Sequence, residues 1–496
     1  MHFQNPILRG DYSDPDVVRV GSDFYLISSS FTYLPGIPVL HSRDLVNWEQ
    51  VGWAAPFLPF ERYDRPAHKC GTWAPSIRYM HGLFYVYVCL PDEGLMAFTA
   101  EKPEGPWTPH FVKDVCGWID PCPLLDDNGD MYLVHGLANS RCGLNNMLFV
   151  HRMSADGLQV LDKGRLVYDG QDHGDVTVEG PKMYKRDGWY YIMCPAGGVE
   201  IGYQLVLRSR SPYGPYERRV TLSQGSTEVN GPHQGGWVDD GQGHDWFIHF
   251  QDRGVYGRIA HLQPVVWKDD WPEMGCAGEP VMEGDTGLTG SVPGCLRMSD
   301  DFADGPGIQW QFQANPRQQW LACLKPGIRL FAAPAKTPFE AGQFLSQLMQ
   351  RECFDMEVAL AWHGRPGDAA GLCMMGYGWT HLQLDGEKLR LIQGKVEEID
   401  RFTPDRIEET CLEEVQVPED FYGNEIRLKM QVRDGMAAYA AWINGSWKVI
   451  GEPLPLTKGG WVGARPGIYC AGTRGQWGGH VDVKEVIVTD TENHRI

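Results

Sequence analysis

The sequence predicts an all-β protein in which a five-bladed β-propeller is followed by a β-sandwich domain. The first observation is a short turn leading into an aromatic strand, which recurs five times before residue 250. The second is the frequency of Gly and Pro before residue 285, which leaves little room for long helices. The third is a change after about Asp300 to runs in which apolar and polar residues alternate, as they do in half-buried strands.

The repeated turn and strand divide the first part of the chain into five units of similar length. Counted from the last aromatic residue of each copy, the units are 60, 47, 59 and 56 residues apart. A unit of that length holds four short strands, and the radial repetition of four-stranded sheets gives a β-propeller. An irregular β-sandwich with chance aromatic residues is the alternative. The copies are 22–26 (SDFYL), 82–86 (GLFYV), 129–133 (GDMYL), 188–192 (GWYYI) and 244–248 (HDWFI).

The two domains are predicted to meet in a glycine-rich segment. Regular patterns thin out between Trp271 and Arg297, where six glycines crowd together. In a chain of 496 residues we therefore expect the propeller over residues 1–285, a linker over 286–299 and the sandwich over 300–496. Within the sandwich, alternating strands are expected near 310–312, 328–331, 389–392, 426–430 and 481–484, with one helix from Ala341 to Leu348.

The composition indicates a globular protein with an acidic surface. Lysine and arginine number 44 against 64 aspartate and glutamate, which gives a formal charge of −20 and disfavours a nucleic-acid partner. The chain has no apolar run of about 18 residues that would predict a membrane span, so no membrane partner is expected. The sequence does not indicate an oligomeric state.

Cysteine use and the first residues favour a cytoplasmic location. The 13 cysteines form no Cys-x-x-Cys pair, and several, such as Cys89 and Cys194, lie inside apolar strand-like runs. A reducing compartment is therefore expected. Residues 1–6 have neither the basic nor the apolar region of a signal peptide. A signal peptide removed beforehand is the alternative.

Three acidic residues precede similar Pro-containing turns in different units of the propeller. Asp14 precedes Pro15, Asp120 precedes Pro121, and Glu179 precedes a Gly-Pro pair. The innermost strands of the blades line the central channel, so equivalent places on different blades converge. Three carboxylates in one cavity repel and their pKa values move apart, which acid-base catalysis uses. We therefore predict a catalytic site, although an isolated Asp-Pro unit is usually a turn.

Short motifs around these acids occur in a fixed order over roughly residues 3–275. The ordered set resembles glycoside hydrolase family 43, which includes β-xylosidases and α-L-arabinofuranosidases built on a five-bladed propeller. Residues 300–496 resemble the concanavalin-like β-sandwich of its xylosidase-like branches. The matching motifs are 5–6 (NP), 13–16 (SDPD), Phe31 with 33–36 (YLPG), 41–48 (HSRDLVNW), 73–75 (WAP), 119–121 (IDP), 179–181 (EGP), 231–233 (GPH) and 256–258 (YGR).

The resemblance implies a role for each acid. Asp14 matches the general base that activates water, and Glu179 matches the general acid that protonates the leaving oxygen. Asp120 matches a third acid that orients Glu179 and raises its pKa by like-charge repulsion. Inversion at the anomeric carbon would follow, with the carboxyl groups of Asp14 and Glu179 roughly 6.5–9.5 Å apart.

The resemblance also implies residues that bind the sugar. Arg258 matches an arginine that holds sugar hydroxyls, and Trp73 and Phe31 match the apolar wall of the pocket. His233 matches a histidine near the channel axis, which in some relatives approaches a bound calcium ion. A structural or activating Ca²⁺ is therefore the one metal suggested, and no organic cofactor is implied. Structural roles for these residues are the alternative.

Two departures and one loop bear on specificity. Lys182 stands where many relatives have histidine, and Val199 stands where some xylosidases have a hydroxyl side chain. In the resembling branch a loop of the C-terminal domain narrows the pocket mouth, and residues 459–463 (GGWVG) are the candidate source.

We therefore expect an inverting, exo-acting glycosidase that releases terminal β-D-xylose or α-L-arabinofuranose from xylan- or arabinan-derived oligosaccharides. Two alternatives stay open at this point. One is a propeller that binds carbohydrate without catalysis, and the other is a retaining five-bladed hydrolase of the fructosidase type.

Overall fold

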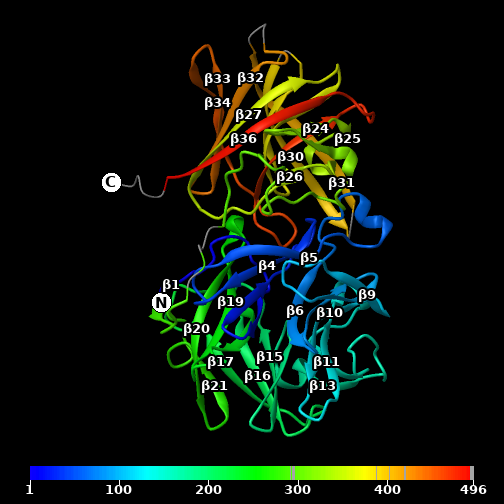
Figure 1. The fold of residues 1–496 in the computed structure, drawn as a ribbon, viewed down its shortest axis with the longest axis vertical. Coiled ribbons are helices and arrows are strands. Elements are labelled where there is room, and N and C mark those ends of the chain that lie inside the picture. The colour runs from blue at the N-terminus through cyan, green and yellow to red at the C-terminus, as the bar shows by residue number, and fades with distance from the viewer. Residues whose placement is uncertain (291, 293–295, 387, 401–402, 418–420, 492–496) are drawn as a thin grey trace.

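The computed structural model describes residues 1–496 except 291, 293–295, 387, 401–402, 418–420 and 492–496. The chain forms two bodies that lie end to end along its longest axis (Figure 1). The first body is a five-bladed β-propeller, and the second is a β-sandwich that carries the C-terminal strand. The predicted fold class is therefore confirmed.

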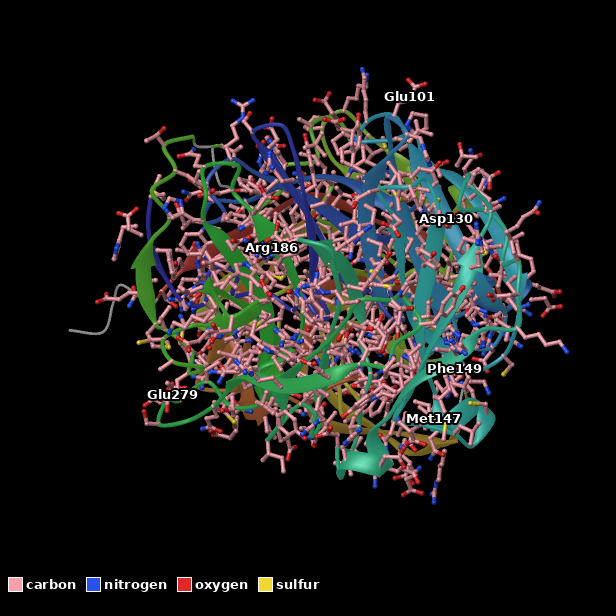
Figure 2. All side chains as sticks on the ribbon, turned by 90° about the horizontal axis from the view of Figure 1, so that it is seen from below. Glu101, Asp130, Met147, Phe149, Arg186 and Glu279 are labelled. Atoms are coloured by element: carbon pink, nitrogen blue, oxygen red, sulfur yellow. The ribbon has the colours of Figure 1, made fainter. Side chains whose placement is uncertain are left out.

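Each blade of the propeller is an antiparallel sheet of four strands that follow one another in chain order. The five aromatic repeats fall on the second strand of each blade, where their rings pack into the cores between blades. Seen from the propeller end, Asp130 and Arg186 belong to successive blades around the ring (Figure 2). The blades are β2 (Asp16–Val20), β3 (Asp23–Ile27), β4 (Gly36–Ser42), β5 (Glu49–Ala55); β6 (Trp73–Met80), β7 (Leu83–Leu90), β8 (Gly94–Ala100), β9 (Thr108–Asp114); β10 (Trp118–Leu125), β11 (Met131–Leu137), β12 (Met147–Met153), β13 (Arg165–Asp169); β14 (Lys182–Arg186), β15 (Trp189–Ala196), β16 (Tyr203–Ser209), β17 (Glu217–Ser223); and β18 (His233–Asp239), β19 (Asp245–Asp252), β20 (Arg258–Lys268), β21 (Trp271–Met274).

The N-terminal residues 2–8 contact both the first and the fifth blade. Strand β1 (His2–Gln4) pairs with β22 (Glu283–Asp285), and Phe3 and Leu8 are buried between the first and fifth blades. The side chain of Asn5 donates to the carbonyl groups of Leu262 and Val281, at 2.8 Å each. These contacts hold the ring of blades closed without a shared sheet.

The sandwich consists of two sheets, antiparallel except where β25 pairs with β35, and their inner faces form one continuous apolar core. The predicted strands near 328–331, 389–392, 426–430 and 481–484 are present, whereas residues 310–312 form only isolated bridges. The sheets are β23 (Leu321–Cys323), β24 (Ile328–Phe331), β36 (His480–Asp490), β27 (Phe354–His363), β32 (Glu425–Arg433), β33 (Met436–Ile443), β34 (Ser446–Pro455); and β25 (Ala333–Pro334), β35 (Arg465–Gly472), β28 (Asp368–Met375), β29 (Thr380–Leu384), β30 (Lys388–Asp400), β31 (Thr403–Gln416), with β26 (Leu345–Ser346) beside β35.

The helix expected from Ala341 to Leu348 is wrong. This stretch is an extended connection in which β26 pairs with β35, and Gln343 donates from its side-chain amide to two backbone carbonyl groups. Its apolar residues face two different cores, so helical spacing would not bury them all. The helical segments of the described residues are α1 (Asn139–Cys142) and the 3₁₀ turns η1 (Glu61–Asp64), η2 (Gly170–His173), η3 (Gly254–Tyr256), η4 (Gln318–Trp320) and η5 (Pro338–Glu340).

Across the described ranges, none of these helices has the length and apolar character needed to cross a membrane. The predicted linker over 286–299 includes 291 and 293–295, which lie outside the described residues.

The two domains share polar contacts that position them against each other. The backbone groups of Leu34 and Phe312 exchange hydrogen bonds of 2.9 and 2.6 Å, and Gln350 donates to the hydroxyl of Tyr12 at 2.9 Å. The buried guanidinium of Arg465 lies 3.9 Å from the ring centre of Tyr33. The sandwich loop 459–463 is thereby held over one end of the propeller.

Candidate active site

The innermost strand of every blade begins beside one residue with left-handed backbone geometry. A positive φ at a residue with a side chain costs on the order of 1–3 kcal/mol and recurs at functional sites. Four of the five residues are followed by proline. They are Asp14 (φ 53°), Ala74 (φ 36°), Asp120 (φ 57°), Gly180 (φ 56°) and Gln234 (φ 35°).

Asp14 is held at this turn by two hydroxyl groups and one cation. Its Oδ2 accepts hydrogen bonds from Ser13 Oγ at 2.8 Å and from Ser29 Oγ at 2.6 Å. Arg258 Nη1 lies 3.3 Å from Oδ1, and the side chain of Asp14 is 4% exposed. Oδ1 is therefore the less engaged oxygen, because its one polar contact within the described part of the chain is the 3.3 Å approach of Arg258.

Asp120 holds the peptide that carries Glu179. Its Oδ2 accepts a 2.7 Å hydrogen bond from the backbone N–H of Gly180. Burial raises the pKa of Asp120 well above its usual value, and the charges of Glu179 and Asp14 raise this pKa further. The Gly180 N–H and the charge of Lys182 act in the opposite direction. The motif match predicts that like-charge repulsion raises the pKa of Glu179, whereas in the structure this repulsion raises the pKa of Asp120.

Glu179 lies between the end of one blade and the start of the next. Its Oε1 is 2.9 Å from Nε2 of His233, which is fully buried, while the Glu179 side chain is 29% exposed. Glu179 therefore has one oxygen fixed by the protein and an exposed fraction that a substrate can reach. Glu179 precedes β14, as expected for a carboxylate that leaves the sheet before a Gly-Pro pair.

The fit of His233 to a calcium ion rests on a single nitrogen. Its Nδ1 is buried and has no hydrogen-bond partner among the described residues, so it is free to face an ion or a water molecule. Calcium takes roughly 6–8 oxygen ligands. No group of three ligating side chains in the described ranges includes His233, so the protein alone does not form a calcium cage here.

Arg258 connects the base to the apolar wall. Its Nη1 donates to Ser13 Oγ at 2.8 Å, and its guanidinium lies 5.8 Å from the ring centre of Phe31. Asp11 fixes its backbone, because Oδ1 of Asp11 accepts from Arg258 N at 2.8 Å. The other oxygen of Asp11 accepts from Gly463 N at 2.9 Å. One buried carboxylate thus joins the arginine to the sandwich loop.

The apolar wall includes two residues from the sandwich. Phe31 and Trp73 are buried in one cluster with Val462. The ring of Trp461 lies 4.6 Å from Trp73, edge to face, and 5.8 Å from Phe31. The loop 459–463 therefore reaches the mouth of the pocket, and Trp461 and Val462 are the residues that touch its wall.

A cleft of about 270 Å³ lies between the propeller and this loop. It is small beside the roughly 300–1,000 Å³ of ordinary ligand pockets. Arg258 links it to Asp14. Its side-chain lining includes Lys69, Val199, Glu200, Asp252, Arg258, Tyr377, Lys458, Trp461 and Val462.

Lys182 is buried beneath the acids and does not face the cleft. Its Nζ donates to the carbonyl group of Pro75 at 2.8 Å and lies 4.0 Å from Asp16 Oδ2. Asp16 is also paired with Arg78 at 2.8 Å. The amine thus ties the turn after Trp73 to the fourth blade.

Sequence reasoning missed three contributors to the site. Ser29 donates to Asp14 and accepts the backbone N–H of Ala74 at 2.7 Å, and Asp11 and Tyr377 were not singled out. The serine run 28–30 after the first aromatic repeat was the only available signal for Ser29. The roles of Asp11 and Tyr377 depend on contacts between domains, which no local pattern records.

The fold and the site together define an enzyme class. A propeller that brings carboxylates from three blades to its axis, beside an arginine and an aromatic wall, has the parts of a hydrolase that cleaves glycosidic bonds with two acids.

The profile described as Glycosyl hydrolases family 43 matches residues 3–272, and the profile described as Beta xylosidase C-terminal Concanavalin A-like domain matches residues 299–489. The chain belongs to glycoside hydrolase family 43. It is 41% identical over 411 residues to a putative β-xylosidase of Xylanibacter ruminicola, a match that covers 79% of this chain and 77% of that protein.

Two further relatives extend the comparison. The chain is 34% identical to the non-reducing end α-L-arabinofuranosidase BoGH43B of Bacteroides ovatus, over 66% of this chain and 64% of that protein. Among solved structures, it superposes with a TM-score of 0.87 and 27% identity on a GH43 glycoside hydrolase engineered for endo-xylanase and exo-arabinofuranosidase activity. That superposition covers 99% of this chain and 100% of the other. The protein is a glycosidase.

Proposed function

We propose that the protein is an inverting, exo-acting glycosidase that releases terminal β-D-xylose or α-L-arabinofuranose from xylan- or arabinan-derived oligosaccharides. The observation that carries the proposal is the arrangement of Asp14, Asp120 and Glu179. They come from three blades, and the charges of Glu179 and Asp14 both raise the pKa of Asp120. Each of the three has its own fixed support.

The mechanism assigns one step to each carboxyl group. Asp14 takes a proton from water through Oδ1 while that water attacks the anomeric carbon. Glu179 gives a proton to the leaving oxygen on the opposite face of the sugar. Asp120 keeps the peptide of Gly180 in place, which fixes the direction of the Glu179 side chain. Arg258 supports Asp14 and offers its remaining donors to sugar hydroxyls.

The exo mode of action follows from the closure of the pocket. Trp461 and Val462 of the sandwich pack on the wall formed by Phe31 and Trp73. A chain end fits such a pocket, whereas a polysaccharide passing through would collide with the loop. The small cleft beside Arg258 then accommodates the leaving part of a short oligosaccharide.

The proposed substrates rest on the relatives. Proteins with sequences similar to this one are named β-xylosidase, xylosidase/arabinosidase and α-L-arabinofuranosidase. The test is hydrolysis of 4-nitrophenyl β-xyloside and α-L-arabinofuranoside beside xylo- and arabino-oligosaccharides. The proposal requires single pentoses as the first products from oligosaccharides. Internal cleavage products, or no hydrolysis of any of these substrates, would contradict it.

Both alternatives are less well supported. A propeller that only binds carbohydrate does not require three mutually repelling carboxyl groups, of which Asp120 has a strongly raised pKa. A retaining hydrolase of the fructosidase type would use one acid as a nucleophile, and the relatives are named xylosidases and arabinofuranosidases, not fructosidases. Product stereochemistry separates the two catalytic mechanisms.

Two further proposals concern location and calcium. A reducing, cytoplasmic location is supported by Cys89 and Cys194, which are buried as free thiols inside the apolar strands β7 and β15. A calcium ion ligated by His233 Nδ1 and otherwise by water is compatible with the buried, unpartnered nitrogen. No catalytic step above depends on it.

A further inference from the structure

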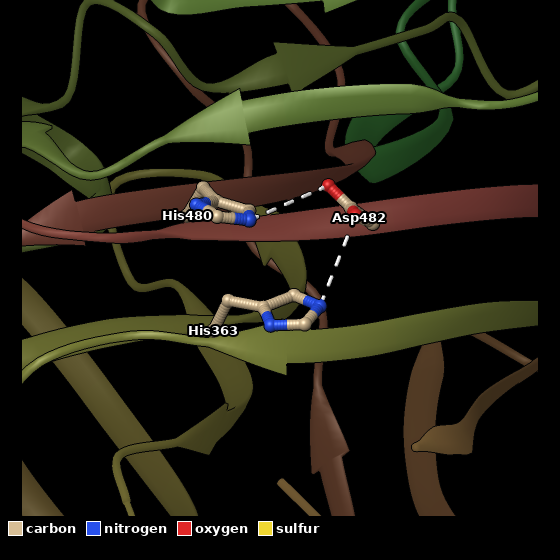
Figure 3. A group of neighbouring side chains, drawn as sticks. All are labelled: His363, His480 and Asp482. Atoms are coloured by element: carbon tan, nitrogen blue, oxygen red, sulfur yellow. Dashed lines mark ion pairs between the residues drawn. The ribbon is translucent and has the colours of Figure 1, made fainter. Parts of the chain in front are cut away.

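Two histidines and an aspartate converge on the outer face of the sandwich, outside the catalytic domain. His363 ends β27, and His480 begins β36, directly opposite it in the antiparallel pair. Asp482 follows two residues later on β36, so its side chain projects from the same face as that of His480. Figure 3 shows both imidazole rings directed toward the carboxyl group of Asp482.

The distances are close to those of a metal site. His363 Nε2 lies 3.8 Å from Asp482 Oδ2, and His480 Nε2 lies 3.9 Å from Oδ1. One ligand atom from each of the three residues can be chosen so that all lie within 4.8 Å of one another. Zinc–ligand bonds of about 2.0–2.2 Å place neighbouring ligand atoms about 3.4 Å apart in a tetrahedral site. The ligand atoms would therefore have to move together by roughly an ångström to bind zinc, and the three side chains are partly exposed, which leaves them room to do so.

Arg329 from the neighbouring strand β24 orients the carboxylate. Its Nε and Nη2 donate to the two oxygens of Asp482 at 2.7 and 2.9 Å. A carboxylate offers about four lone-pair directions, so each oxygen keeps one for an ion. Ligating carboxylates are commonly hydrogen-bonded in this way by an outer shell. The guanidinium charge repels a cation, which makes the site weaker than a closed structural zinc site.

We propose that His363, His480 and Asp482 bind one divalent transition-metal ion, with Zn²⁺ as the probe and a water molecule in the fourth position. Imidazole and carboxylate ligands suit Zn²⁺ and its first-row neighbours better than calcium or magnesium. The ion would join β27 to β36, the last strand of the sandwich, while Arg329 extends the link to β24. Its role is to stabilise the sandwich, independently of the chemistry in the propeller.

The test compares Zn²⁺ binding to the full-length protein and to a His363→Ala/His480→Ala variant after treatment with EDTA. The matched control is His244→Ala, because His244 pairs with Asp240 at 2.9 Å without a second histidine. We expect wild type and the control to bind one more equivalent of Zn²⁺ than the double variant in titration calorimetry. Saturating Zn²⁺ should raise their melting temperature by about 3 °C more than that of the double variant.

Spectroscopy keeps the test independent of folding. Co²⁺ bound in the proposed site of the wild type should give the visible absorption of a tetrahedral ion, and Asp482→Asn should weaken Co²⁺ binding at least about tenfold. Unchanged hydrolysis of an aryl glycoside by both variants would show that the propeller is intact. Equal Zn²⁺ stoichiometry and equal melting shifts in wild type and the double variant would overturn the proposal, as would a Co²⁺ spectrum that survives the double substitution.

Discussion

The carboxyl group of Asp120 accepts a 2.7 Å hydrogen bond from the backbone N–H of Gly180, the residue that follows Glu179. Asp120 thus fixes the peptide group that joins Glu179 to Gly180. The contact joins the third blade to the fourth at the propeller axis, where both residues have positive φ. The direction in which Glu179 points is therefore set by a neighbouring blade.

Glu179→Ala tests the role of the general acid. The variant should lose at least about 10²-fold in kcat/KM on oligosaccharides, because their leaving oxygen needs a proton. Aryl glycosides with activated leaving groups need less help and should lose less. The measurement is the ratio of the two losses in steady-state kinetics. An equal loss on both substrate types would count against the assignment.

Asp120→Asn tests the electrostatic state of the third acid. Because the folded-state pKa of Asp120 is raised above its unfolded value of 3.8, chiefly by burial, ionisation destabilises the native state as pH rises. Asparagine keeps an oxygen for the Gly180 N–H and removes the charge. The variant should therefore gain free energy of unfolding over wild type at neutral pH, and the gain should vanish below about pH 4.

Urea unfolding of both proteins across this pH range checks the Asp120 prediction. Each unit by which the pKa is raised corresponds to about 1.4 kcal/mol at neutral pH. A stability difference that is the same at every pH would mean that the substitution acts through packing and not through titration.

Activity should fall in the same variant, because the like-charge interaction with Glu179 is lost.

Trp461→Ala tests the contribution of the sandwich to the pocket. Loss of the ring contacts with Trp73 and Phe31 should raise KM for xylo-oligosaccharides about 3- to 10-fold. The kcat value on aryl glycosides should change less, since the acids are untouched. Trp477→Ala, an exposed tryptophan of the same domain, is the control and should leave both constants unchanged. Similar constants for Trp461→Ala and wild type would show that the loop does not contact substrate.

Lys182→Met tests the buried amine beneath the acids. The variant loses a charged hydrogen bond to the carbonyl group of Pro75, worth about 1.5–3 kcal/mol of stability. Lys185→Met on the same strand is a matched control, because Lys185 is partly exposed and should cost less. Urea denaturation at neutral pH measures both. A smaller loss for Lys182→Met than for Lys185→Met would contradict this account.

The fold was predictable because its signal is repeated. Five aromatic strands recur at similar spacing, and each occupies the second position of its blade, so the loss of any one copy would leave the pattern of blades recognisable. The segment 341–348 had no such redundancy. Its apolar residues serve two cores in an extended conformation, and a short apolar run does not distinguish that from a helix.

The sequence marked candidate residues for the site but not the geometry that the structure gives them. Proline after Asp14 and Asp120 marked the left-handed turns, yet Glu179 stands one position earlier, before Gly180. That offset leaves the positive φ at Gly180 and not at the acid itself, which the residue types alone do not predict. The contact of Trp461 with Trp73 joins residues nearly four hundred positions apart, and only the packing of the two domains creates it.

The most direct measurement of the central claim is the anomeric configuration of the first product, followed by ¹H NMR during hydrolysis of a β-xyloside or an α-L-arabinofuranoside. If Asp14 activates water on the face opposite to Glu179, the sugar must first be released with inverted configuration, and mutarotation follows. Initial release with retained configuration would mean that a carboxylate attacks the sugar itself, and the assignment of Asp14 as a general base would be wrong.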